Sequence, residues 1–316
     1  MFVPLLVPPQ ATWGSCLEIT VGKGDATLSL YSIIIPCRNE GEHLRRTILS
    51  LEQARGPEQE IIVVDDGSED GCCDFLRSVE MPAVRLVAAG KLGVAGARNA
   101  GAAAARGEVI CFCDAHLEVP AGWLQSLSRP IREGAADVVC PAVADSRSPG
   151  AAGYGVTWGA GLQWQWIRSR PPGPAYVPLA PGGCLMMSRP VYEALDGFER
   201  GFCGFGFDDQ EFSLKAWLFG FRVMVQPEVT VSHFFRPAHP YPVGTEEVLY
   251  NFLRMALLHF HRERLARVLE MTRGHPDFPG VMARLLAGDA PEKRRRYFQR
   301  RRYDDDWFME RFSIPF

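Results

Sequence analysis

The stretch from Val109 to His116 constrains this chain more than any other feature of the sequence. Its first five residues are apolar and partly β-branched, and the run stops at Asp114, with His116 two residues later. Such a run is typical of a buried parallel strand, and open α/β sheets bind ligands at the carboxyl ends of their strands. Because residues two apart in an extended chain point the same way, Asp114 and His116 are candidate ligands of one Mn²⁺- or Zn²⁺-like ion. For two residues alone, an aspartate that begins a turn beside a satisfied histidine is the alternative.

Apolar runs elsewhere in the first half alternate with segments of helical spacing, which is the pattern of an α/β fold. We expect short strands over residues 31–36, 60–64, 84–88, 109–113 and 137–140. We expect helices over residues 41–54, 69–79, 97–106 and 122–133. Strands and helices in alternation predict a mostly parallel, doubly wound sheet that binds a nucleotide.

The usual nucleotide-binding fingerprints are missing from this half. Residues 93–97 do not form a GxGxxG motif, and no GxxxxGK[ST] motif is present, which argues against a dinucleotide enzyme or a P-loop ATPase. The acids at the strand ends, Asp65, Asp66 and Asp114, instead indicate held base or ribose hydroxyls and a metal on the phosphates. Acids also cap helices, and for Asp65 both interpretations stay open.

The second half contains three further candidate site segments. Gly182 and Gly183 precede a strand, where paired glycines allow close backbone approach to a ligand or simply form a tight turn. Asp208 and Asp209 begin a helix in which three of four residues are acidic, more than capping needs. The tryptophans at 158, 164 and 166 are a core cluster or the wall of a groove.

The strand that ends at His233 supplies a third candidate metal ligand. Arg236 follows it and offers a planar fork of donors to phosphates. His239 and Tyr241 lie in the next loop, among prolines and Gly244, and we expect residues 236–245 to form a lid over the bound ligand.

Composition excludes some classes of protein and gives an expected compartment. A net charge of −3 gives no overall basic field for nucleic acid, and no apolar run approaches the ~20 residues of a membrane span. The first nine residues lack the basic start and the cleavage site of a signal peptide. Nine cysteines, an odd number without framework spacing, indicate free thiols in a reducing cytoplasm.

We expect one catalytic unit with a helical tail. Residues 1–30 form a lead-in, residues 31–250 the catalytic domain, and residues 251–316 a helical extension packed on it. The basic run over residues 293–302 is expected to be a solvated face, and the aromatic residues at 307–308 to dock back on the body.

The chain resembles the metal-dependent nucleotide-sugar glycosyltransferases of the GT-A fold. The family-2 likeness comes from residues 32–40, SIIIPCRNE, and residues 63–68, VVDDGS. Within that group the chain is similar to the catalytic domain of the polypeptide N-acetylgalactosaminyltransferases, from about residue 32 to the C-terminus. Their DxH motif matches Asp114–His116, and their HxFR segment matches His233–Arg236.

The resemblance implies a transferase that moves a hexose or N-acetylhexosamine from a UDP-sugar to a Ser, Thr or Cys side chain of a peptide. It implies Mn²⁺, with Mg²⁺ as an alternative, bound by Asp114, His116 and His233. It also implies a loop carrying His239 and Tyr241 over the donor. The donor-binding residues that we assign are Pro36, Arg38, Glu40, Asp65, Asp66, Arg98, Gly182, Gly183, Arg236, His239 and Tyr241.

Departures from the family pattern concern the reaction's stereochemistry and its setting. The family's WGGEN segment is residues 205–209 here, with Phe205 in place of Trp and Asp209 in place of Asn. Asp208 and Asp209 are the candidate catalytic residues, and Asp209 as a general base would favour inversion, whereas the resemblance favours retention. The family's signal anchor, stem and lectin domain are absent from this sequence, so we expect a bacterial-type cytoplasmic enzyme.

Two other functions stay open for the same residues. A family-2 transferase that builds a polysaccharide or modifies a small natural product would have the same donor motifs. A nucleotide-sugar-binding module without turnover is the alternative of another class, and the complete set of Asp114, His116 and His233 argues against it.

Overall fold

A computed structural model describes residues 30–316, apart from residue 57 and residues 79–80. The lead-in predicted over residues 1–30 lies outside these described residues except for its last one. No helix in the described part of the chain is both long and apolar enough to cross a membrane.

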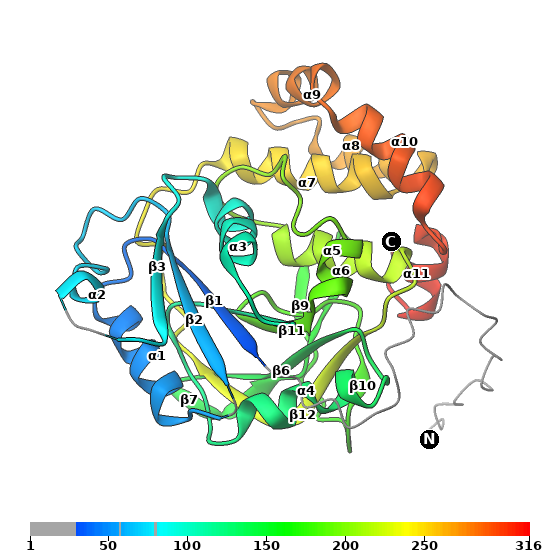
Figure 1. Cartoon of the computed structure of the whole chain (residues 1–316). Helices are drawn as coiled ribbons and strands as arrows, with labels where there is room; N and C mark the ends of the chain where they lie inside the picture. The colour runs from blue at the N-terminus through cyan, green and yellow to red at the C-terminus, as the bar shows by residue number, and fades with distance from the viewer. Residues whose placement is uncertain (1–29, 57, 79–80) are drawn as a thin grey trace.

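A ten-stranded sheet forms the centre of the molecule (Figure 1). Its first half is parallel, in the order β4-β1-β2-β3. These strands are β1 (Tyr31–Cys37), β2 (Gln59–Asp65), β3 (Val84–Ala88) and β4 (Val109–Cys113). All four follow the apolar runs of the sequence, and crossover helices make their parallel pairing possible.

The second half of the sheet is mixed. β11 (Cys184–Ser188) runs antiparallel between β4 and β6 (Val138–Asp145), and β12 (Val223–His233) runs parallel to β6. Short strands complete the sheet at its edges: β5 (Leu117–Glu118), β7 (Ser148–Gly153) and β10 (Ala175–Tyr176). A separate antiparallel pair consists of β8 (Val156–Trp158) and β9 (Trp164–Trp166).

Helices cover both faces of the sheet because successive strand residues point to opposite faces. Ile33 and Ile35 of β1 share one buried cluster with α1 (Glu42–Gln53) and α4 (Trp123–Arg132). Ile34 belongs to the other cluster, with α3 (Gly93–Ala104) and α6 (Asp208–Leu218). Gly101 of α3 lies so close to the sheet that a Cβ there would be 2.3 Å from Cγ2 of Ile34. The small side chains of this helix therefore bring its N-terminus near the strand ends.

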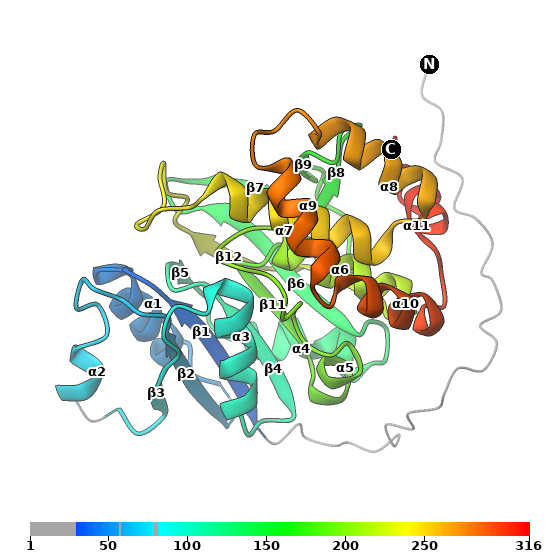
Figure 2. The ribbon, with the colours of Figure 1, turned by 90° about the horizontal axis from the view of Figure 1, so that it is seen from above.

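Two short helices, α2 (Phe75–Ser78) and α5 (Arg189–Ala194), occur earlier in the chain. The C-terminal helices gather over one half of the sheet, away from α1 and β3 (Figure 2). The C-terminal helices are α7 (Thr245–His259), α8 (Arg262–Thr272), α9 (Phe278–Ala287), α10 (Ala290–Arg300) and α11 (Asp305–Arg311). The domain boundary predicted at residue 250 falls inside α7, whose buried side chains join the core of the sheet. Phe308 of α11 is fully buried against Trp158, so the prediction that the aromatic tail docks on the body is confirmed.

The solvated face predicted for the basic run is wrong for three of its seven basic side chains, whereas Arg295, Arg296, Arg300 and Arg302 are exposed as expected. Arg294 donates to the carbonyl of Phe260 (2.7 Å), and Arg301 to that of His259 (3.2 Å), at the C-terminal end of α7. Lys293 pairs with a buried carboxylate, Glu199, at 2.8 Å. The last carbonyls of a helix lack partners within the helix, and Arg294 and Arg301 provide hydrogen bonds to them at the end of α7.

Candidate active site

A cavity of about 500 Å³ opens at the carboxyl ends of β1 and β4, the edge of the sheet where the sequence predicts that a ligand binds. Its walls come from these strand ends, the glycine turn before β11, residues 204–210 and the loop after β12. The lining contains every predicted site residue except Asp65. Asp65 accepts the backbone N–H of Ser68 (2.8 Å) in its own turn, and its role toward a donor stays a prediction.

The three predicted metal ligands converge at one end of this cavity. Asp114 and His116 follow β4, and the pairing of His233 with Leu117 between β12 and β5 brings the third ligand beside them. Nε2 of His233 lies 3.2 Å and Nε2 of His116 lies 4.0 Å from the same carboxylate oxygen of Asp114. Ligands about 2.1 Å from an ion and at right angles to each other lie about 3 Å apart, so these spacings fit one ion. One oxygen and two imidazoles suit Mn²⁺.

Residues next to the ligands orient His116 and shift the pKa values of His116 and Asp114. Nδ1 of His116 lies 3.1 Å from a carboxylate oxygen of Glu40, a contact that orients the ring and leaves Nε2 toward Asp114. Burial lowers the pKa of His116, but Glu40 and Asp114 raise it overall. Burial also opposes ionisation of Asp114, yet His233 and the charges of His116 and Arg98 hold its pKa well below the usual range. Nδ1 of His233 has no hydrogen-bond partner among the described residues. The ring is therefore positioned by strand β12 and by the contact of its Nε2 with Asp114.

The glycine pair lies directly against the ligands. A Cβ on Gly183 would be 3.1 Å from Cδ2 of His233 and 3.4 Å from a carboxylate oxygen of Asp114. The carbonyl of Gly183 accepts the N–H of Asp114 (2.9 Å), and the N–H of Gly182 donates to Asp209 (2.9 Å). The close backbone approach predicted for these glycines is therefore made to the ligand set and to α6.

Arg98 connects the ligands to the start of α6. Its guanidinium is 3 % exposed, forms an ion pair with Asp208, and donates to the carbonyl of Gly182 (2.8 Å). It also lies 3.4 Å from Asp114. We assigned Arg98 to the donor; it lines the cavity, but these bonds go to protein groups and hold Asp208 and Asp114 in place.

Asp209 lies at the start of α6 without capping it. The cap residue is Phe207, which has a left-handed backbone (φ 65°) and makes no side-chain cap. The carboxylate of Asp209 accepts the N–H groups of Gln210 (2.8 Å) and Gly182 (2.9 Å). Burial, followed by the charge of Asp208, raises the pKa of Asp209 to about 7. A half-buried carboxyl with this pKa can exchange a proton near neutral pH.

The loop predicted to be a lid crosses the cavity and contacts both walls. The ring centroids of His239 and Phe205 are 4.3 Å apart, and the guanidinium of Arg38 lies 4.7 Å from the Tyr241 ring centroid. Asn39 donates to the carbonyl of Pro240 (3.3 Å). Arg236, assigned to phosphates, forms an ion pair with Glu40 in this structure.

Several contributors to the site were not identified from the sequence. Asn251 of α7 is 1 % exposed and bonds to Cys203 (2.7 Å) and Gly206 (3.1 Å), which holds the wall formed by residues 203–206. A polar residue inside a helical pattern gave no signal for this contact. The tryptophan cluster divides, since Trp158 is core, whereas Trp164 and Trp166 line the cavity.

Asp66 binds loop amides and lines the cavity as well. Its carboxylate accepts the N–H groups of Leu92 (2.5 Å) and Gly93 (2.9 Å) at the start of α3. Burial raises the pKa of Asp66 despite these bonds. Asp66 thus makes the helix-capping contacts that were the alternative to binding a base or ribose, and it also lines the cavity.

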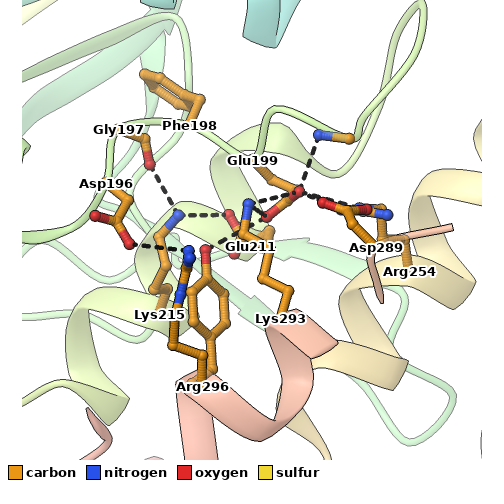
Figure 3. A network of polar contacts seen from close by, with 12 residues as sticks. Asp196, Gly197, Phe198, Glu199, Glu211, Lys215, Arg254, Asp289, Lys293 and Arg296 are labelled. Carbon is orange, nitrogen blue, oxygen red and sulfur yellow. Dashed lines mark hydrogen bonds and ion pairs between the residues drawn. The ribbon is translucent and has the colours of Figure 1, made fainter. Parts of the chain in front are cut away.

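A closed network of charges joins Glu199 and α6 to the C-terminal helices, and Figure 3 shows it from close by. Glu199, fully buried, pairs with Arg254 of α7 (2.8 Å) and Lys293 of α10 (2.8 Å). Glu211 pairs with Lys215 (3.2 Å), one turn further along α6. The network fastens the C-terminal helices to the segment that leads into Asp208.

Comparisons with known proteins agree with this geometry. The model of the family "Glycosyl transferase family 2" matches residues 32–195. Polypeptide N-acetylgalactosaminyltransferase 11 of Xenopus tropicalis is 34% identical over 258 residues, which cover 72% of this chain and 42% of that protein. The probable N-acetylgalactosaminyltransferase 8 of Caenorhabditis elegans is 37% identical over 169 residues, covering 48% of this chain and 40% of that protein. The chain thus spans less than half the length of these curated relatives.

Solved structures share the fold. The crystal structure of GalNAc-T7 with UDP, GalNAc and Mn²⁺ superposes with a TM-score of 0.73 at 22% identity, covering 92% of this chain and 57% of that one. S. aureus TarS 1–349 in complex with UDP-GlcNAc gives a TM-score of 0.56 at 19% identity, covering 83% and 78%. The predicted GT-A fold is confirmed by these likenesses.

Proposed function

The chain belongs to glycosyl transferase family 2, and from that premise we propose that it moves a hexose or N-acetylhexosamine from a UDP-sugar to a Ser, Thr or Cys side chain of a peptide. The convergence of Asp114, His116 and His233 at the end of the cavity carries this proposal. The relatives named as N-acetylgalactosaminyltransferases support the donor and the acceptor class.

The residues of the cavity divide the work of such a reaction. A divalent ion, Mn²⁺ or alternatively Mg²⁺, held by the three ligands would neutralise charge on the diphosphate leaving group. Arg236 lies beside Glu40 within reach of the same end, as a second cation for that charge. Gly182 and Gly183 keep the wall flat where a sugar would lie, and the loop carrying His239 and Tyr241 excludes water when closed.

A second candidate is an inverting transferase that acts on a polysaccharide or a small natural product. The observation in its favour is the pair of buried Asp208 and half-buried Asp209, in which desolvation and the neighbouring carboxylate raise the pKa of Asp209 to about 7. A general base of that pKa would deprotonate an acceptor hydroxyl during attack from the far face of the sugar.

Release of UDP from a panel of UDP-sugars tests the proposal. The protein is incubated with and without Mn²⁺, against water and against a mixture of Ser-, Thr- and Cys-containing peptides, and the peptides are weighed by mass spectrometry. Mn²⁺-dependent release with a peptide gain of one sugar supports it. Release without any modified peptide favours the second candidate, and binding without release means a module without turnover.

The proposed compartment is the cytoplasm. Its support is the arrangement of the eight described cysteines, which are free although Sγ atoms of Cys37 and Cys72 lie 3.5 Å apart. Thiol titration of denatured, unreduced protein from its native host should find close to nine thiols. Three or more disulfides would contradict the assignment.

A further inference from the structure

Three cysteines form a compact group beside the cavity, distinct from the ligand set of Asp114. Cys37 ends β1, and Cys72 and Cys73 lie in the segment after β2. Their Sγ atoms form a nearly equilateral triangle, with separations of 3.5, 3.8 and 3.9 Å. We propose that this triangle binds a thiophilic d¹⁰ cation of the Zn²⁺ kind, a second metal site of different chemistry from the first.

The size of the triangle fits such an ion. With Zn–S bonds of about 2.3 Å, neighbouring sulfurs of a tetrahedral site lie about 3.8 Å apart. The three observed separations match one face of that tetrahedron without moving the backbone. Thiolate ligands select Zn²⁺ over the harder Mn²⁺ or Mg²⁺.

A water would take the fourth position. Asp70 is exposed and accepts the N–H of Cys72 (3.0 Å) with one carboxylate oxygen and the N–H of Gly41 (2.9 Å) with the other. A water between this carboxylate and the ion would complete the tetrahedron. Cys37 lines the cavity and Cys72 is 7 % exposed, so an ion has a route to the sulfurs.

A second cysteine triangle in the same chain serves as an internal control. Cys111 and Cys113 alternate along β4, and Cys184 lies opposite Cys113 on β11, with Sγ separations of 3.8 and 3.9 Å. Sheet geometry alone produces these distances, and the three side chains are at most 1 % exposed. Cys72 and Cys73, in contrast, are consecutive residues, and strand alternation does not aim consecutive side chains at one point. Only the first triangle therefore has an arrangement that strand geometry leaves unexplained, together with an open side.

Occupation of the site would brace one wall of the cavity. Asn39, two residues after Cys37, donates its N–H to Ser68 (3.1 Å) and its side chain to the carbonyl of Pro240. An ion joining Cys37 to Cys72 and Cys73 would lock the end of β1 to this segment. Binding of Zn²⁺ should therefore raise the melting temperature, independently of any transferase activity.

Cobalt spectroscopy on the full chain tests the proposal. Protein stripped of metals under a non-thiol reductant is titrated with Co²⁺, and thiolate-to-cobalt charge transfer is followed in the near ultraviolet. We expect one Co²⁺ per chain with this absorption, displaced by Zn²⁺ and retained with excess Mn²⁺. Co²⁺ at Asp114, His116 and His233 has no thiolate and does not give the band.

Matched variants locate the band. Cys72→Ser should weaken Co²⁺ binding roughly tenfold or more, while Cys184→Ala should leave it unchanged. No band in the wild-type protein, a band that persists in Cys72→Ser, or one lost in Cys184→Ala overturns the proposal. If Cys72→Ser does not fold, alkylation mapping of the wild-type chain decides: Zn²⁺ should protect Cys72 and Cys73 from a maleimide, and equal labelling with and without Zn²⁺ overturns the site.

Discussion

Two clusters of charged side chains meet on α6 and differ in their charge balance. The cavity cluster consists of Glu40, Arg98, Asp114, Asp208, Asp209 and Arg236, four carboxylates against two guanidiniums. The closed cluster consists of Glu199, Glu211, Lys215, Arg254, Asp289 and Lys293, three carboxylates against three cations (Figure 3). The cavity cluster therefore has more carboxylates than cations, whereas the two are equal in number in the closed cluster.

The pKa values follow this difference. Burial and the charge of Asp208 raise the pKa of Asp209 to about 7 in the cavity cluster. In the closed cluster burial opposes ionisation of Glu199, but Lys293 and Arg254 lower its pKa to about 2. An excess of acids over cations in a cavity is typical of sites that receive a cation, whereas balanced buried charges are structural. Variants of the first cluster should therefore affect activity, and variants of the second should affect folding.

The largest expected effect on activity comes from the metal ligands. His233→Ala should lower Mn²⁺-dependent turnover roughly 10³-fold, because several kcal/mol of leaving-group stabilisation depend on the ion. The melting temperature should change little. Turnover and Mn²⁺ affinity are measured beside His275→Ala, a histidine outside the cavity that pairs with Asp277. A His233→Ala enzyme, or a chelated wild-type enzyme, that transfers sugar at full rate would falsify the assignment.

The closed cluster should show the opposite behaviour. Glu199→Gln leaves Arg254 and Lys293 buried with too little negative charge, which should cost about 3–5 kcal/mol in the free energy of unfolding. Urea denaturation measures this against Glu228→Gln, an exposed partner of Arg129 whose loss should cost less than about 1 kcal/mol. Because the pKa of Glu199 is lowered by folding, its contribution is present above its unfolded pKa and is lost as the pH falls toward 2. Equal costs for the two variants would remove the distinction between the clusters.

Asp209 tests the proposed role of the cavity cluster most directly, because its pKa of about 7 lets it exchange a proton near neutral pH. If it is the general base, Asp209→Asn should lose about 10²-fold in turnover while keeping UDP-sugar affinity. A base must be deprotonated, so wild-type turnover should fall as the pH drops below about 7, and the variant should lose this limb. The product should be β-linked from an α-linked donor, by the proton coupling of its anomeric signal. An α-linked product returns the enzyme to the retaining class.

The smallest expected effect concerns the lid over the cavity cluster. UDP with Mn²⁺ should slow amide exchange across residues 236–245. Asn39→Asp removes only the hydrogen bond to Pro240, worth about 1 kcal/mol, and should raise the donor KM roughly fivefold with little change in kcat. Asn39→Ala also loses the bond that the Asn39 side chain accepts from the N–H of Glu69 (2.8 Å), so its effect should be at least as large. Identical exchange with and without UDP would argue against a lid.

Much of the fold was predictable because its signals are local. The apolar runs of β1, β2 and β4 and the helical spacing of α1 are set within about a dozen residues, and the structure contains them where expected. Asp114 and His116 were identified together because strand alternation places residues two apart on one side. His233, 117 positions after His116, was a candidate from the end of its own strand, but its approach to the other two ligands depends on the pairing of β12 with β5.

The sequence by itself determined the four strands of the parallel half, the helices α1, α3 and α4, and the chemistry of the ligands at the strand ends. It did not predict the short edge strands, and the helix expected over residues 69–79 is only Phe75–Ser78 in the described residues. Tertiary structure decided which charges meet: Glu40 with His116, Arg98 with Asp208, and Glu199 with Arg254 and Lys293. It also drew three cations of a basic run expected to face solvent, Lys293, Arg294 and Arg301, into a buried ion pair and the end of α7. The physical reason is that periodicity records burial of apolar surface along one element, whereas a charge neutralised by a distant partner has the same sequence signature as a solvated one.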